Sequence, residues 1–214
     1  MIGDNMSLLH DKIYASQHEE ERFIQKYLNK NPDEEKGTYV DIGSGEPCEI
    51  SNTYYYYWRG WNGLLVEPHP RYAEKIRVTR PRDIFKPIAI SNYDGIIQMC
   101  DTATIGSFIG NDYKSKFPEK CFDIKCMTMN NLFAKYPQFL EVDILNIDIE
   151  THEDKALSQC DFKIIKPKII LIEFTVRGVD YRKNWEHYIL PYYDFQEIIP
   201  DSSNAIYTRK KENI

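Results

Sequence analysis

The sequence predicts an α/β fold: a mostly parallel seven-stranded sheet with helices between its strands and an antiparallel hairpin at its C-terminal end. Residues 38–42 read as a buried strand that ends in an acid and a Gly-Ser-Gly turn, and residues 168–174 form a near-continuous apolar run. Such a run is typical of a central parallel strand. The 214 residues suffice for one domain, in which residues 1–34 form a helical extension and residues 35–214 the core.

The N-terminal half predicts two helices around the first strand. Residues 16–31 have a helical pattern, with Ser16 as N-cap and Glu19 three residues further on, as in a capping box. Residues 51–53 supply an N-cap for a second helix at 54–59. The apolar side chains of the first helix fall on one face, so we expect this helix to pack on the sheet.

The remaining elements follow from alternation, apolar runs and turn residues. Further strands are expected at 63–67, 85–90, 96–100, 122–129, 142–148, 168–174, 195–199 and 205–209, and helices at 70–77, 130–136, 151–160 and 184–190. Residues 92–95 have the composition of a hairpin-type turn. The strand at 122–129 alternates like an antiparallel edge strand, and residues 102–120 form an irregular insertion of the kind that is usually functional.

A ligand site is predicted where the first two strands end. Gly43 and Gly45 let the backbone take a positive φ and come close to a ligand, because no Cβ is in the way. Glu67 ends the second strand. In an open α/β sheet this pattern places a nucleoside over the carboxyl ends of the strands, with the second acid on its ribose hydroxyls.

Two classes of cofactor use this geometry, the dinucleotides and S-adenosylmethionine. A dinucleotide fingerprint needs a third glycine, which is absent here, and Glu46 and Glu49 stand where a diphosphate would bind. S-adenosylmethionine carries a sulfonium and an ammonium group, which nearby acids favour. The charge pattern therefore favours the methyl donor over a nucleotide-cofactor oxidoreductase.

The composition restricts partners and compartment. A net charge of −6 argues against non-specific binding to nucleic acids, which needs clustered positive charge. The chain lacks a signal-peptide pattern and any apolar run of the roughly 20 residues that a membrane span needs, so we expect a cytoplasmic protein. The five cysteines contain no Cys-x-x-Cys pair, and we expect free thiols in a reducing compartment.

Several stretches carry a resemblance to a known family. They are residues 39–45, 51–53, 60–68, 89–91 with 94–95, and 143–150 with Glu153 and Leu157. In this order the sequence resembles the FkbM family of S-adenosylmethionine-dependent methyltransferases. The resemblance implies a Rossmann-like class I methyltransferase fold and O-methylation of a sugar or another natural-product hydroxyl. Thr151 departs from the family pattern, which has glycine there, and could narrow the pocket beside Glu150.

Cofactor contacts are expected from the strand ends and the loops after them. The candidates are Asp41, Gly43, Ser44, Gly45, Asn52, Glu67, Pro68, Ser91, Asn92 and Asp148. Asp41 and the glycine loop are assigned to the methionine end. Glu67 can accept both ribose hydroxyls, or else pair with Arg71.

Two of these assignments have equally good structural alternatives. The amide of Asn52 could reach the cofactor carboxylate or only cap a helix, and Ser91 and Asn92 could lie beside the adenine or only form a turn.

The catalytic candidates follow the fourth strand. Asp148, Glu150 and His152 lie at the edge that faces the transferred methyl group, where a carboxylate or an imidazole could take the acceptor's proton. For His152 the alternative is an exposed histidine at a helix start. Asp148, Glu150 and Glu153 could also hold a divalent cation, but nearby acids are more often solvated or paired, and no metal is predicted.

The acceptor is expected to be a small molecule or a glycan, with no nucleic acid and no membrane as partner. Acceptor selection would come from residues 102–120, the N-terminal helix, residues 176–190 or a second subunit, so a homodimer stays open. The rival outside enzymology is a methyltransferase-like binding module without turnover. The basic residues between the second and third strands predict a solvated helix face; they are Arg71, Lys75, Arg77, Arg80, Arg82 and Lys86.

Overall fold

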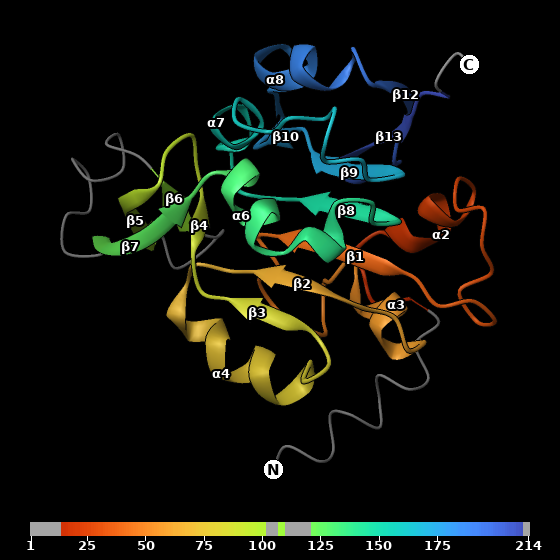
Figure 1. Ribbon diagram of the computed structural model, residues 1–214, viewed down its shortest axis with the longest axis horizontal. Coiled ribbons are helices and arrows are strands. Elements are labelled where there is room, and N and C mark those ends of the chain that lie inside the picture. Colours follow the sequence, from red (N-terminus) through yellow and green to blue (C-terminus); the bar gives the residue numbers. More distant parts are fainter. Residues whose placement is uncertain (1–13, 102–106, 110–120, 212–214) are drawn as a thin grey trace.

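The central sheet of the computed structural model has seven strands within the residues that the structure describes, which are 14–101, 107–109 and 121–211. In spatial order they are β12 (Tyr193–Ile198), β13 (Asn204–Arg209), β9 (Ile169–Glu173), β8 (Ile144–Ile147), β1 (Thr38–Ile42), β2 (Asn62–Val66) and β3 (Ile84–Lys86) (Figure 1). The five strands from β9 to β3 are parallel, and β13 pairs antiparallel with both β9 and β12. The predicted fold class, including its C-terminal hairpin, is confirmed.

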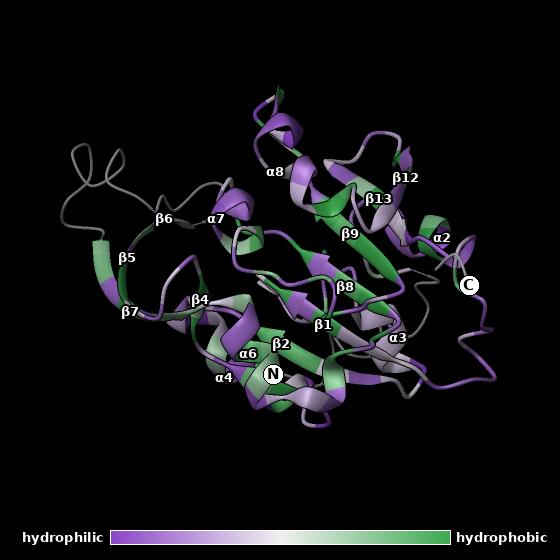
Figure 2. Cartoon of the chain, turned by 45° about the horizontal axis from the view of Figure 1, so that its top comes forward, coloured by the Kyte–Doolittle hydropathy of each residue, from purple (hydrophilic) through white to green (hydrophobic). Residues whose placement is uncertain are grey.

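Helices cover both faces of this sheet. They are α2 (Glu20–Gln25), α3 (Tyr54–Trp58), α4 (Pro70–Thr79), α6 (Met129–Lys135), α7 (Glu153–Leu157) and α8 (Arg182–Ile189), with a 3-10 turn η2 (Pro137–Phe139). Successive side chains of a strand point to opposite faces. Val40 and Ile42 of β1 therefore pack in the core under α6, α7 and α8, whereas Tyr39 packs in the core under α2, α3 and α4. The strands β8 and β9 between these layers are mostly hydrophobic (Figure 2).

The first helix is shorter than the predicted 16–31. The hydroxyl oxygen of Ser16 accepts the N–H of Glu20 at 2.8 Å, and the N–H of Ser16 donates to the carboxylate of Glu21 at 2.8 Å. Glu19, the predicted partner in the capping box, has a left-handed φ of 57° and caps nothing. The local hydrogen bonds thus form a turn before α2, because Ser16 bonds to Glu20 and Glu21 rather than to Glu19.

A second sheet, which the sequence did not predict, lies beside the first. Its order in the described residues is β4 (Ala89–Ile90), β7 (Cys121–Met127), β5 (Gly95–Asp101) and β6 (Ser107–Ile109). The predicted strand at 85–90 divides between the two sheets, because Pro87 has no N–H to continue the ladder after β3. Residues 102–106 and 110–120, most of the predicted insertion, lie outside the described residues.

The pairing within this second sheet contradicts two predictions. β7 pairs parallel with β4 and antiparallel with β5, so it is an inner strand and not an edge strand. The turn at 92–95 joins strands that are not neighbours, and it is therefore no hairpin. Asp94 explains the turn's actual role: its carboxylate accepts the N–H of Thr128 at 2.8 Å and the amide of Asn131 at 2.7 Å, which fixes it to the start of α6.

The expectation that all cysteines are free thiols is wrong. The register of β5 and β7 places Cys100 opposite Cys121, and the two form a disulfide. Their separation of 21 residues in sequence gave no sign of this pairing. Cys48, Cys126 and Cys160 are free.

The buried guanidinium of Arg80 joins the loop after β1 to the sheet. Arg80 is 1% exposed, so it does not belong to the predicted solvated helix face. Its Nε donates to Asp83 at 2.8 Å, one terminal nitrogen donates to the carbonyl oxygen of Pro47 at 3.1 Å, and the other donates to Tyr39 Oη at 2.8 Å and Thr53 Oγ1 at 3.1 Å. Charge-assisted hydrogen bonds of this kind are about twice as strong as neutral ones.

The same network continues into the centre of the sheet through Asp41. Thr53 donates its hydroxyl to Asp41 at 2.6 Å, and Asn146 of β8 donates its amide to the other carboxylate oxygen at 2.8 Å. Asn52 in turn donates its amide to Asn146 at 3.0 Å. Residues 47–53 are thus fixed to β1, β8 and the end of α4, which sets the position of the glycine loop.

Replacing Arg80 tests whether this network holds the fold. Arg80→Ala leaves Asp83 buried without its cation, and loss of one partner of a buried pair costs about 3–5 kcal/mol. We expect the free energy of unfolding, measured by urea denaturation, to fall by that amount. The matched control is Arg77→Ala on the exposed face of α4, which should change it by less than about 0.5 kcal/mol. Equal effects of the two substitutions would contradict the role of Arg80.

Candidate functional site

A cavity of about 540 Å³ opens at the carboxyl ends of β1, β2 and β8. The predicted site residues on its wall are Gly43, Ser44, Gly45, Glu67, Pro68, Asp148 and Glu150. Its wall also contains residues that were not predicted, among them Gln17, His69, Tyr72, Met99 and Glu173. The predicted residues Asp41, Asn52, Ser91, Asn92 and His152 are not among those that line it.

The glycine loop lies tightly between the ends of β2 and β8. Gly43 has a φ of +83°, and a Cβ at this position would come within 1.7 Å of the backbone oxygen of Asp148, so only glycine fits. The N–H groups of Gly43 and Ser44 donate to the carbonyl oxygen of Val66 at 2.8 and 3.2 Å. The backbone at the cavity floor is therefore held before any ligand binds.

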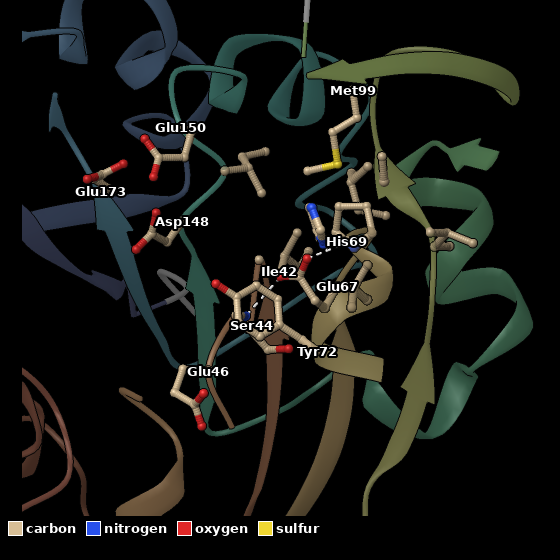
Figure 3. Close-up of a pocket in the computed structure, with 18 of the residues that line it drawn as sticks. Ile42, Ser44, Glu46, Glu67, His69, Tyr72, Met99, Asp148, Glu150 and Glu173 are labelled. Carbon is tan, nitrogen blue, oxygen red and sulfur yellow. Dashed lines mark hydrogen bonds between the residues drawn. The ribbon is translucent and has the colours of Figure 1, made fainter. Parts of the chain in front are cut away.

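Glu67 at the end of β2 holds the loop from the other side. One carboxylate oxygen accepts the N–H of Gly45 at 2.9 Å and the other accepts the N–H of His69 at 2.6 Å (Figure 3). Burial raises the pKa of Glu67 to about 7. An ionised carboxylate offers about four acceptor positions, so two stay available for a ligand such as a ribose.

The predicted alternative for Glu67 was an ion pair with Arg71. The guanidinium of Arg71 lies 3.5 Å from the carboxylate of Asp101, and His69 Nε2 lies 3.2 Å from the same carboxylate. Asp101 on β5 thus orients both basic residues of the cavity wall.

Three acids from two strand ends face one another across the cavity from His69 and Met99 (Figure 3). Asp148 and Glu173 form a hydrogen-bonded carboxyl pair; burial raises the pKa of both, and the charge of Asp148 adds to the rise at Glu173, whereas the hydrogen bond from Glu173 lowers the pKa of Asp148. Burial, and then the charge of Asp148, raises the pKa of Glu150 to about 7. The cavity therefore holds protons near neutral pH that a bound cation would displace.

A fourth acid lies behind this group. Glu153, 2% exposed, accepts the N–H of Ile149 at 3.0 Å, and burial raises its pKa to about 8. Glu150 and Thr151 both take positive φ values, 56° and 75°. The family glycine expected at residue 151 would adopt this backbone without strain, whereas a β-branched threonine is an outlier there.

His152 and its neighbours form a cluster outside the lining residues. His152 Nε2 lies 3.1 Å from Ser91 Oγ, and burial lowers the pKa of the imidazole. Ser91 Oγ also lies 3.4 Å from the side-chain oxygen of Asn92. This places the three residues next to Ala89 and Ile90, which do line the cavity, rather than on its wall.

Two further findings concern the described residues as a whole. None of their helices has both the length and the apolar character that crossing a membrane requires. Among them, no three histidine, cysteine, aspartate or glutamate side chains converge in an arrangement that could hold a metal ion.

Comparison with known proteins identifies the class. Residues 35–200 match the family model of the methyltransferase FkbM domain. The chain belongs to this family of S-adenosylmethionine-dependent methyltransferases. A comparison with curated proteins gives no match.

Two solved structures resemble the fold. Methyltransferase FkbM from Methylobacillus flagellatus is 14% identical with a TM-score of 0.51; the match covers 85% of this chain and 45% of that one, so this chain spans less than half of its length. A methyltransferase from Geobacter sulfurreducens is 8% identical with a TM-score of 0.50, covering 97% and 86%. At these identities the likeness shows the Rossmann-like class I fold alone.

The cavity residues fit S-adenosylmethionine. The volume lies in the range of about 300–1,000 Å³ that is usual for cofactor sites. The buried hydroxyl of Ser44 has no hydrogen-bond partner among the described residues and lies on the cavity wall. Glu67 keeps two acceptor positions for the ribose, and the acids at the ends of β8 and β9 complement the sulfonium and ammonium groups.

The raised carboxyl pKa values predict a pH dependence of ligand preference. Both ligands carry the ammonium group, but S-adenosylhomocysteine lacks the sulfonium charge, so S-adenosylmethionine gains more when Glu150 and the Asp148–Glu173 pair ionise. Between pH 5.5 and 8 we expect the affinity ratio of the two ligands to rise in favour of S-adenosylmethionine. The rise is about tenfold for each unit by which the cation lowers a carboxyl pKa.

Calorimetric titration of both ligands across this pH range measures the ratio. The ionisation of Glu67 affects both ligands alike and cancels in it. Glu150→Gln should flatten the pH dependence. A ratio that stays constant with pH in the unaltered protein would contradict the proposed electrostatic role of the acids.

Proposed function

We propose that this protein transfers a methyl group from S-adenosylmethionine to a hydroxyl oxygen of a sugar, a glycan or a small natural product. The observation that supports the proposal is Glu150, a half-buried carboxyl on the cavity wall at the end of β8 whose pKa lies near 7. A base with this pKa can hold or release a proton at neutral pH, which is what efficient proton transfer needs.

The acids of the cavity have two proposed roles, one for Glu150 and one for Asp148 together with Glu173. When bound, the cofactor supplies an electrophilic methyl group on its sulfonium. As the acceptor oxygen bonds to that methyl carbon, the methyl–sulfur bond would break with its electron pair left on the sulfur, so that S-adenosylhomocysteine would be the leaving group. Glu150 would take the proton of the acceptor hydroxyl onto a carboxylate oxygen and later release it to water. Asp148 and Glu173, which share a proton, supply negative charge beside the reacting groups. Proton transfer to a positioned base contributes about 10²–10⁴-fold to the rate.

The charges of the cavity support a neutral acceptor. Three acids face its interior from β8 and β9, and a phosphorylated or carboxylated acceptor would be repelled there. The basic residues on the described cavity wall, His69 and Arg71, are both engaged by Asp101. Outside that wall, Lys75 pairs with Glu46 at 2.5 Å and Arg80 is buried. A polyol such as a sugar is uncharged, so the acids do not repel it and it needs no basic residue as a partner.

The expectations about partners, oligomeric state and location remain proposals that rest on the sequence. A net charge of −6 supports a protein without a nucleic-acid partner. A homodimer is proposed on the sequence alone, whereas the cytosolic location expected from the sequence has one observation against it. The Cys100–Cys121 disulfide argues against the cytosol, where persistent disulfides are rare.

An acceptor panel tests the proposed function. The panel contains neutral sugars, deoxysugars and short glycans, each matched with an amino and a carboxylated analogue. We expect S-adenosylhomocysteine to form only with the hydroxyl acceptors, together with an O-methyl product identified by mass spectrometry and NMR. Methylation of the amino analogues alone would contradict the proposal, and cofactor binding without turnover on the panel would favour the binding module.

Substitution at two positions tests the assignment of the base. Glu150→Gln should lower kcat by about 10²–10⁴-fold, because the amide cannot accept the proton. His152→Ala should change kcat by less than about threefold, since the imidazole bonds to Ser91 outside the cavity wall. The affinity for S-adenosylhomocysteine serves as the control for cavity structure in both variants. The reverse order of effects would assign the proton to His152.

A further inference from the structure

A segment outside the matched family domain contributes to the cavity wall. The match begins at residue 35, yet Gln17 lines the cavity. Residues 14–21 lead into α2, which Figure 1 shows to the right of β8 and β9. We call residues 14–21 the N-terminal strap.

The strap is attached at both of its ends. The carbonyl oxygen of Ala15 accepts the N–H of Ser51, at the end of the glycine loop, at 3.3 Å. At the other end the carboxylate of Glu20 accepts the hydroxyl of Ser202 at 2.7 Å and the amide of Asn204 at 3.2 Å, both next to the C-terminal hairpin. The strap therefore runs from the glycine loop to β13.

Hydrogen bonds within the strap fix the backbone around Gln17. The fully buried carboxylate of Glu21 accepts the N–H groups of Ala15 at 2.9 Å and Ser16 at 2.8 Å, and it also bonds to the Ser16 hydroxyl. Gln17 is thus placed by a buried carboxylate on one side and by the Glu20 contacts on the other. Its position does not depend on a ligand.

The strap lies at the acidic side of the cavity. Asn204, which Glu20 holds, is the register partner of Glu173 on β9. Figure 3 shows Glu173, Asp148 and Glu150 together on one side, with His69 on the other. His69 and Arg71, the basic side chains on the described wall, are oriented by Asp101 on that opposite side.

The carboxylate of the cofactor needs hydrogen-bond donors on the acidic side of the cavity. The methionine part of the cofactor carries a carboxylate as well as an ammonium group, and a carboxylate among acids needs hydrogen-bond donors. Of the described lining residues, Gln17 has an exposed side chain with no hydrogen bond to another described residue, and the Ser44 hydroxyl is buried without a partner among them. Asn52, for which the sequence predicted either this carboxylate or a helix cap as partner, donates its amide to Asn146.

We infer that Gln17 of the N-terminal strap donates its side-chain amide to the carboxylate of the cofactor, together with the hydroxyl of Ser44. The inference rests on the cofactor of the family and not on the proposed acceptor. It makes the strap, which lies outside the matched domain, a part of the cofactor site.

Titration calorimetry with two ligands tests this assignment. S-adenosylhomocysteine has the amino-acid part, whereas 5′-methylthioadenosine has the same nucleoside and thioether without it. Gln17→Ala should weaken S-adenosylhomocysteine binding by about 10- to 100-fold, the effect of losing a hydrogen bond to a charged group. The affinity for 5′-methylthioadenosine should change by less than about twofold. The matched control is Gln138→Ala on the exposed surface, which should change neither affinity.

Three results would overturn the inference. A loss of less than about twofold for S-adenosylhomocysteine would exclude the amide contact, and equal losses for both ligands would show that Gln17 only supports the cavity wall. If Asn52→Ala but not Gln17→Ala selectively lost affinity for S-adenosylhomocysteine, the contact with the cofactor carboxylate would be assigned to Asn52. If the unaltered protein bound neither ligand, the cofactor assignment itself would fail, which is distinct from failure of the Gln17 contact.

Discussion

The buried guanidinium of Arg80 is the constraint on which the site depends. A charge in the protein interior is tolerated only where acceptors surround it, and here Asp83, Tyr39, Thr53 and the Pro47 carbonyl provide them. These acceptors come from β1, from the loop that follows it and from the turn between α4 and β3. The hydrogen bonds of the Arg80 guanidinium therefore fix the loop after β1 relative to β1 itself and to the end of α4. The glycine loop, which closely approaches the Asp148 backbone, has its position set by this network before a ligand binds.

A second constraint is the surplus of carboxyl groups at the strand ends. Their burial raises several carboxyl pKa values toward neutrality, so the free cavity is partly protonated. A cationic cofactor reverses this, because its charge stabilises the ionised acids and gains from them in turn. The same group of acids thus favours the methyl donor over its neutral product and leaves a base of suitable pKa beside the acceptor. Binding and proton transfer use one electrostatic arrangement.

The sequence predicted the fold from local signals and missed what long-range pairing decides. Glu67 and Asp148 were predicted because ligands of an open α/β sheet bind at the carboxyl ends of its strands. The same reasoning, applied to the apolar run at 168–174, would have predicted Glu173 as well. Arg80 was assigned to a solvated face because basic residues surround it in sequence, while its partners come from distant segments. Asp41 and Asn52 have hydrogen-bond partners within the protein, which no motif reveals. Gln17 has no sequence signal, since its position depends on how residues 14–21 cross the sheet end.

Thermal unfolding of the unaltered protein and of Glu67→Ala, each with S-adenosylhomocysteine and with NAD, tests most directly that this cavity is the cofactor site. A ligand at about 100 times its Kd adds ~2.7 kcal/mol, which raises the midpoint of a domain of this size by roughly 5–11 °C. The account predicts that shift for the unaltered protein with S-adenosylhomocysteine, none with NAD, and a much smaller shift for Glu67→Ala at the same ligand concentration. A shift with NAD, or an equal shift in Glu67→Ala, would contradict it.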